Sequence, residues 1–198
     1  FGNSDSAWLW EFFGFDGERL LGVLKVDGQS LGYGWVNLMT GETKSLAPTS
    51  NWGRFAASPD GQWLAFTTTL DQPGQQTGTD GISADVWRVP TNGGEPEKLF
   101  RFPSRVHDLC WAADGSGLFV VSELGGGQAH NDIWFVPNSE PLTRMRKLTF
   151  GQADEERPSV SRDGRWLVFT DNQRGATSLV ARDLTDGSDH AVRIEQMD

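Results

Sequence analysis

Cysteine, histidine, tyrosine and long apolar runs are all scarce in this chain of 198 residues. The single cysteine, Cys110, excludes a disulfide framework within one chain and leaves the redox compartment open. No apolar run approaches the roughly 18 residues that a membrane-spanning helix needs, so no transmembrane segment is predicted. No stretch shows a sustained helical period either. Together these absences favour a soluble, all-β fold.

Basic residues are also fewer than acidic residues. The chain holds 17 Lys and Arg against 27 Asp and Glu, for a formal net charge of −10. Its acidic residues are spread over the expected loops, so a phosphate-binding surface and a nucleic-acid partner are not predicted. Cys110 falls in an expected first strand, where an inert buried thiol is more typical than a nucleophile.

Glycine and tryptophan, by contrast, are frequent, with 24 and 9 residues. Four Asp-Gly pairs each precede an apolar run, at intervals of roughly 45–55 residues, a period typical of propeller blades. The pairs are Asp16-Gly17, Asp60-Gly61, Asp114-Gly115 and Asp163-Gly164. Asp-Gly between two strand-like runs predicts a hairpin, because Gly accepts positive φ and Asp bonds to the nearby backbone.

The register around the four pairs is shared. The fourth residue after each Asp is leucine, which predicts one buried position repeated as Leu20, Leu64, Leu118 and Leu167. The third residue before each Asp falls in a first strand, as Phe13, Ala57, Trp111 and Val160. A third strand and a short outer strand follow in every copy, so each unit is a four-stranded meander. Four tryptophans at equivalent positions are predicted to fill the core between blades: Trp63, Trp166, Trp87 and Trp134.

Two of the copies carry a recognisable motif. Ser58-Pro59-Asp60-Gly61, followed by Gln62-Trp63-Leu64-Ala65-Phe66-Thr67, resembles the core signature of TolB-type β-propeller repeats. The segment 158–170 resembles it too, and Lys147-Leu148-Thr149 is similar to the outer strand that leads into the next blade. In the first and third copies Gly14-Phe15 and Ala112-Ala113 replace Ser-Pro, so those copies are assigned by spacing and by leucine.

The resemblance covers essentially the whole chain and implies one β-propeller domain over residues 1–198. We expect four antiparallel blades, near 6–49, 50–101, 104–150 and 155–195. TolB-like families usually have six or more blades, and Phe1 is neither an initiator Met nor the start of a leader. The sequence is therefore expected to be a mature form or a fragment of a larger propeller. The resemblance also implies a periplasmic or secreted location.

One catalytic motif requires an alternative interpretation. Gly28-Gln29-Ser30-Leu31-Gly32 matches the G-x-S-x-G pattern of serine hydrolases. A nucleophile elbow needs a helix directly after the serine, whereas Tyr33-Gly34-Trp35-Val36 reads as a strand. A Gly-rich hairpin is the favoured interpretation, and no catalytic residue is predicted.

The polar residues of the expected loops include three histidines and one acidic run that could form a metal or ligand site. His107, His130 and His190 lack zinc-type spacing, so no metal and no cofactor are predicted. His107 and His130 are nevertheless expected on one face of the disc, where a metal or ligand role for the pair is the alternative to solvent-facing histidines. The acidic run Asp154-Glu155-Glu156-Arg157 lies in the connection that leads into the fourth blade. A solvated loop is its usual meaning, and a site for a cationic ligand is the alternative.

The loops between strands four and one and between strands two and three should surround the channel, on the face opposite the Asp-Gly hairpins. The predicted binding residues on that face are Trp52, Arg54, His107, Asp108, His130, Glu155 and Arg157. Two functions remain open. One is a non-catalytic TolB-like module that binds a protein or peptide in the cell envelope. The other is the N-terminal accessory propeller of an exported hydrolase, whose covalently linked catalytic domain is a prolyl-oligopeptidase-type serine peptidase or a metal-dependent amidohydrolase.

Overall fold

Four antiparallel sheets, each of four strands, make up the fold. The computed structural model describes residues 7–16, 18–26, 29–47, 53–69, 83–124, 130–173 and 176–193. Each sheet is a meander in which consecutive strands are hydrogen-bonded neighbours. The predicted four-bladed, all-β architecture is therefore confirmed.

The blades follow one another along the chain. The first holds β1 (Ala7–Asp16), β2 (Arg19–Val26), β3 (Gln29–Asn37) and β4 (Thr43–Ala47). The second holds β5 (Phe55–Ala57), β6 (Trp63–Thr69), β7 (Ala84–Pro90) and β8 (Glu97–Phe102). The third holds β9 (Asp108–Trp111), β10 (Gly117–Ser122), β11 (Asp132–Pro137) and β12 (Arg146–Lys147). The fourth holds β13 (Asp154–Val160), β14 (Trp166–Gln173), β15 (Ala176–Asp183) and β16 (Asp189–Arg193).

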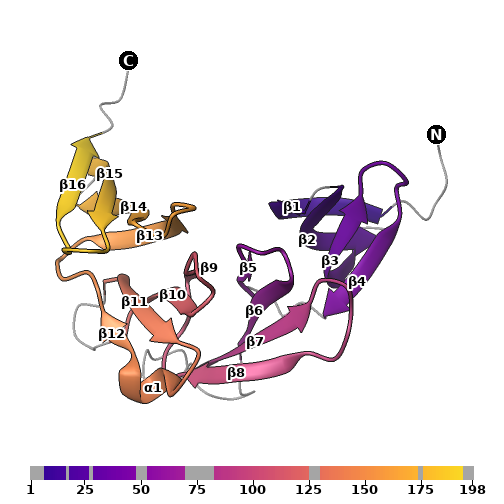
Figure 1. The fold of residues 1–198 in the computed structure, drawn as a ribbon, viewed down its shortest axis with the longest axis horizontal. Coiled ribbons are helices and arrows are strands. Elements are labelled where there is room, and N and C mark those ends of the chain that lie inside the picture. The colour runs from indigo at the N-terminus through magenta and orange to yellow at the C-terminus, as the bar shows by residue number, and fades with distance from the viewer. Residues whose placement is uncertain are drawn as a thin grey trace.

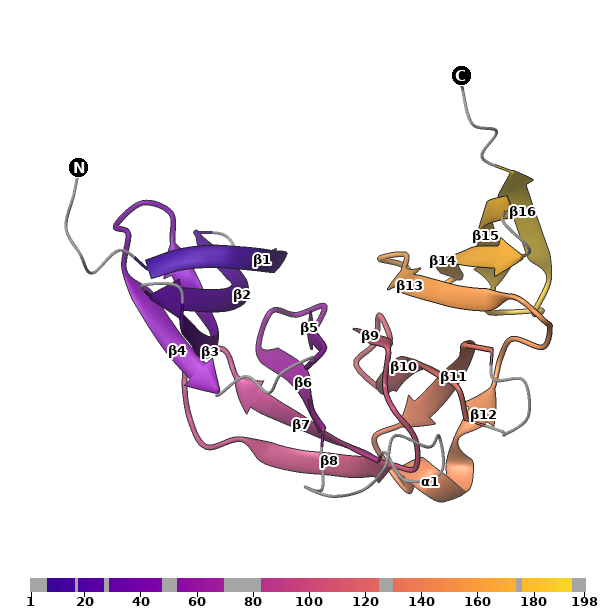
Figure 2. The same cartoon turned by 180° about the vertical axis from the view of Figure 1, so that it is seen from behind.

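The blades stand side by side in an open arc, which is part of a propeller ring (Figures 1 and 2). Strands β1, β5, β9 and β13 lie on the inner side of the arc, and the last strand of each blade lies outside. A single helical turn, α1 (Pro141–Arg144), interrupts the third blade before its outer strand. In the described ranges no helix has the length and apolar character needed to cross a membrane.

A serine–aspartate pair builds the Asp-Gly hairpins that match the TolB motif best. Ser58 Oγ donates to Asp60 Oδ1 at 2.5 Å, and the amide of Trp63 donates back to Ser58 Oγ at 2.9 Å. Ser161 and Asp163 repeat this arrangement in the fourth blade, where the Ser161 hydroxyl is also 2.5 Å from the carboxylate. The glycine after each Asp has a φ near +70°, which favours glycine over any other residue. The motif is thus a self-contained turn.

Three apolar cores lie between adjacent blades. One joins the first and second blades around Leu21, Tyr33 and Leu64. Another joins the second and third around Phe102, Leu109 and Leu118. The last joins the third and fourth around Phe119, Ile133 and Leu167.

The predicted leucine repeat is correct in three blades and wrong in the first. Leu64, Leu118 and Leu167 have no exposed surface, but Leu20 is only half-buried and Leu21 occupies the core instead. Leu20 pairs with Phe15 and not with Phe13, because β1 contains register shifts and the β1–β2 pairing continues to Asp16 and Arg19. A bulge of this kind moves the side chains beyond it to the other face of the strand.

The tryptophan prediction is also only partly correct. Trp63, Trp87 and Trp134 are half-buried and pack at the edges of the cores. Trp166 belongs to none of the three cores and stacks edge-on against His190. Among the side chains that the structure describes, the buried tryptophans are Trp35 and Trp111. Trp35 donates from Nε1 to the Thr91 carbonyl, and Trp111 donates from Nε1 to the Ala56 carbonyl, so each ties one blade to the next.

Candidate functional site

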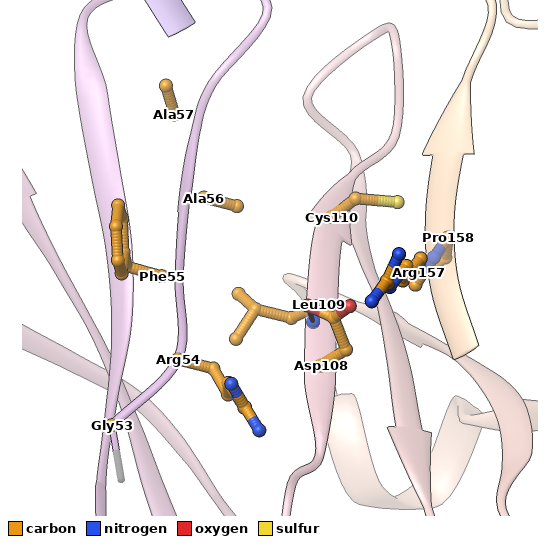
Figure 3. A pocket seen from close by; sticks show the side chains of 10 residues that line it. All are labelled: Gly53, Arg54, Phe55, Ala56, Ala57, Asp108, Leu109, Cys110, Arg157 and Pro158. Carbon is orange, nitrogen blue, oxygen red and sulfur yellow. Dashed lines mark hydrogen bonds between the residues drawn. The ribbon is translucent and has the colours of Figure 1, made fainter. Parts of the chain in front are cut away.

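A cavity of about 570 Å³ opens on the inner side of the arc, between the innermost strands of the second, third and fourth blades. Its volume falls within the roughly 300–1,000 Å³ typical of ligand sites. Figure 3 shows the lining side chains, which come from β5 and the residues before it, from β9, and from β13. They are Gly53, Arg54, Phe55, Ala56, Ala57, Asp108, Leu109, Cys110, Arg157 and Pro158.

Arg54 stands at the point where the chain reaches β5. Its amide donates to Thr67 Oγ1 at 2.8 Å, and its carbonyl accepts from the Thr67 amide at 2.8 Å. Two bonds to one residue of β6 fix the backbone, while the side chain is exposed. The guanidinium group therefore projects from a rigid base.

Asp108 begins β9 and is half-buried. Burial raises the pKa of its carboxyl group, and hydrogen bonds from the backbone of Leu109 and Arg157 and the charges of Arg54 and Arg157 oppose that rise. The Leu109 amide donates to Asp108 Oδ1 at 2.9 Å. The carboxylate thus takes hydrogen bonds from main-chain amides and lies within electrostatic range of both arginines.

Arg157 lies in β13 at an irregularity of the ladder. Glu156 pairs with Thr170 and Ser159 pairs with Val168, and the register shifts between these two pairs. Arg157 has a φ of 54°, in the left-handed region that non-glycine residues seldom adopt. Bulges in innermost strands redirect side chains, and here the bulge places Arg157 on the cavity wall, beside the buried Pro158.

The two histidines expected on the same face are held by acidic neighbours outside this cavity. His107 Nε2 lies 3.1 Å from Glu123 Oε1, an ion-pair distance. Burial lowers the pKa of His107, although Glu123 acts in the opposite direction. His130 Nδ1 lies 3.9 Å from Asp154 Oδ1. Trp52, the remaining expected aromatic residue, lies outside the described residues.

The acidic run before the fourth blade is not the solvated loop expected from sequence. It forms the first part of β13, and Glu155 is only 4% exposed. The Glu155 amide donates to the Asn131 carbonyl at 2.9 Å, so the residue sits where the third blade meets the fourth. Burial, with repulsion from Asp132, raises the pKa of Glu155 to about 7. This carboxyl group does not line the cavity.

Sequence reasoning missed the apolar wall of the site. Ala56, Leu109 and Pro158 supply it, together with Cys110, and no composition signal separates such residues from core. Burial raises the pKa of the Cys110 thiol, which opposes formation of a nucleophilic thiolate.

Ser30 lies within strand β3, not at a helix terminus. No three His, Cys, Asp or Glu side chains of the described residues gather in a way that would hold a metal ion.

Known structures resemble the arrangement of the blades. TolB from Acinetobacter baumannii superposes with a TM-score of 0.70 over 91% of this chain and 42% of its own, at 16% identity. The fold is that of a TolB-type propeller. An oligogalacturonate lyase solved with manganese matches with a TM-score of 0.67 over 98% of this chain and 55% of its own, at 15% identity. A prolyl endopeptidase matches with a TM-score of 0.59 over 98% of this chain and 29% of its own, at 16% identity.

One curated relative is similar in sequence. The uncharacterized peptidase YuxL of Bacillus subtilis (strain 168) is 29% identical over 163 aligned residues, which represent 67% of this TolB-type propeller. The propeller spans only 22% of the length of that relative. The present chain matches no protein-family model.

Proposed function

We propose that this chain is the non-catalytic propeller of a peptidase and that it receives a peptide at the cavity between β5, β9 and β13. The similarity to YuxL carries the proposal, because it is a likeness in sequence as well as in fold. The structural likeness to a prolyl endopeptidase supports the same choice. Of the two hydrolase classes considered from sequence, the peptidase is therefore preferred to the amidohydrolase.

The cavity fits such a role. Strands β5, β9 and β13 hold its wall, which combines apolar side chains with the charged groups of Arg54, Asp108 and Arg157. Loops and edges on a rigid scaffold are where binding residues concentrate. An exported location follows from the TolB resemblance and is part of this proposal.

Hydrogen exchange tests the binding surface. A short unstructured peptide added to the chain should slow amide exchange in 53–57, in 108–110 and at Arg157. The Asp-Gly hairpins at 58–62, 112–116 and 161–165 serve as the internal control and should exchange as before. Protection of the hairpins alone, or of neither set at saturating peptide, would contradict the proposal.

A second function, a free-standing module that binds a folded protein, is favoured by the higher TM-score with TolB. The coding sequence beyond Asp198 distinguishes the two. An α/β domain with a positioned nucleophile supports the peptidase, whereas further blades alone support the free-standing module. Fluorophosphonate labelling of the chain should fail in either case, and labelling abolished by Ser30→Ala would contradict both.

A further inference from the structure

Two guanidinium groups face the cavity without an ion-pair partner among the described residues. Arg54 and Arg157 are both exposed, and neither takes part in the salt bridges of the described residues. Some other arginines are engaged: Arg101 binds Asp85, Arg165 binds Asp183 and Arg182 binds Asp189. Exposed Arg162, like Arg54 and Arg157, takes part in none of the salt bridges of the described residues. What distinguishes Arg54 and Arg157 is that both line one cavity and act on one carboxylate.

Asp108 lies within electrostatic range of both arginines without using their hydrogen-bond donors. Both side chains act electrostatically on this one carboxylate. Its hydrogen bonds come instead from the backbone, including the Leu109 amide at 2.9 Å. Each guanidinium group therefore keeps the planar fork of donors that matches a second carboxylate in bidentate geometry.

The backbone conformation of Arg157 also supports a binding role for this residue. A left-handed φ on a residue with a long side chain is strained, and such strain collects at ligand-binding positions. Here the strained residue is one of the two unpaired arginines, and its register shift places it on the cavity wall. Figure 3 shows Arg54 and Arg157 on either side of Asp108.

We propose that Arg54 and Arg157 together bind a carboxylate of the peptide that enters the cavity, while Leu109 and Pro158 contact its apolar part. The proposal rests on the proposed function, because it takes peptide as the ligand. Either a C-terminal carboxylate or an acidic side chain supplies this chemistry. Asp108 limits the affinity for anions, because its negative charge acts on the same space as both arginines.

Three dye-labelled pentapeptides of alanine with a central phenylalanine test the proposal by fluorescence anisotropy against the 198-residue chain. One ends in a free carboxylate, one ends in an amide, and one is an amide with an alanine replaced by glutamate. We expect at least one carboxylate-bearing probe to bind roughly tenfold more tightly than the neutral amide, as charge-assisted pairs do. The stronger of the two identifies the source of the carboxylate.

Variants assign the effect to the cavity. Arg54→Gln and Arg157→Gln should each remove most of the preference for carboxylate, and Arg157→Lys should restore part of it. Arg162→Gln is the matched control, because it removes the same charge from an exposed arginine beside an Asp-Gly hairpin, and its preference should not change. Thermal unfolding of each variant checks that the fold is intact.

Asp108→Asn distinguishes recognition of a carboxylate, as proposed, from recognition of a cationic group. Asparagine keeps an acceptor for the backbone amides and removes the negative charge, so the carboxylate probe should bind several-fold more tightly. Weaker binding would show that Asp108 recognises a cationic group, and this would overturn the proposal. Equal binding of the neutral and carboxylate probes would also overturn it, while leaving the cavity a peptide site. If none of the probes binds, the proposed function itself fails.

Discussion

At the scale of single residues, the sequence predicted which side chains lie near the channel better than it predicted what they do there. Arg54, Asp108 and Arg157 line one cavity, whereas His107, His130 and Glu155 are engaged by neighbours. Repeat spacing assigns a residue to a loop or strand. It does not show a register shift, and the shift in β13 decides which way Arg157 points.

Strain at Arg157 can be measured with two substitutions. Arg157→Gly and Arg157→Ala remove the same charge, but only glycine adopts a φ of 54° freely. We expect the glycine variant to be more stable than the alanine variant by roughly 1 kcal/mol, by the usual cost of a left-handed residue. Urea denaturation gives the difference. Equal stabilities would mean that Arg157 does not hold this conformation in solution.

Buried Glu155 should make stability depend on pH. The pKa of Glu155 is about 7 in the folded chain, against 4.5 for an ordinary glutamate. The folded state therefore holds the proton more tightly, and the free energy of unfolding falls as pH rises from about 4.5 to about 7. Glu155→Gln stays neutral and should be more stable than wild type at about pH 8, by roughly 1–3 kcal/mol.

Near pH 4.5 the advantage of Glu155→Gln should shrink to a small fraction of that value, because the wild-type carboxyl group is then protonated in the folded state and about half protonated in the unfolded state. The low-pH measurement is the internal control. A constant difference between the two proteins across this range would show that Glu155 is not buried as described.

At the scale of strands and hairpins, local chemistry made the fold predictable. The Ser-x-Asp-Gly turns satisfy their own hydrogen bonds, so their sequence identifies them without tertiary contacts. The first blade lacks that serine, and there the predicted register was wrong by one residue. The short helix α1 and the strand formed by the acidic run were missed for a related reason. Each depends on contacts with neighbouring chain that composition does not show.

Leucine-to-alanine substitutions test the corrected register. Leu64→Ala and Leu167→Ala should each cost roughly 2–5 kcal/mol, as cavity-forming changes in a core do. Leu21→Ala should fall in the same range, while Leu20→Ala should cost only about 1 kcal/mol, the central value for ordinary substitutions. Chemical denaturation gives the four values. A larger cost at Leu20 than at Leu21 would restore the register expected from sequence alone.

At the scale of the molecule, the repeated Asp-Gly pair predicted the number of blades and their order along the chain. The open arc in which the blades stand was seen only in the structure. Equivalent strands in each repeat must pack on the next repeat, so the period predicts stacked units. It does not predict the channel chemistry, because the scaffold is shared by proteins with different activities. The similarity to a peptidase and the arginine-lined cavity supply that part of the argument.

The three cores between blades also determine how stability is shared along the chain. Each core joins only two neighbouring blades, so energetic coupling passes from blade to blade, as in a one-dimensional array. A cavity made by Leu167→Ala weakens the core shared by the third and fourth blades and leaves the core around Leu21 intact. Amide exchange should therefore accelerate most in β14 and β15, less in β10, and not measurably in β2 and β3. The second and third blades are each held by two cores, and they should be the last part of this chain to lose structure.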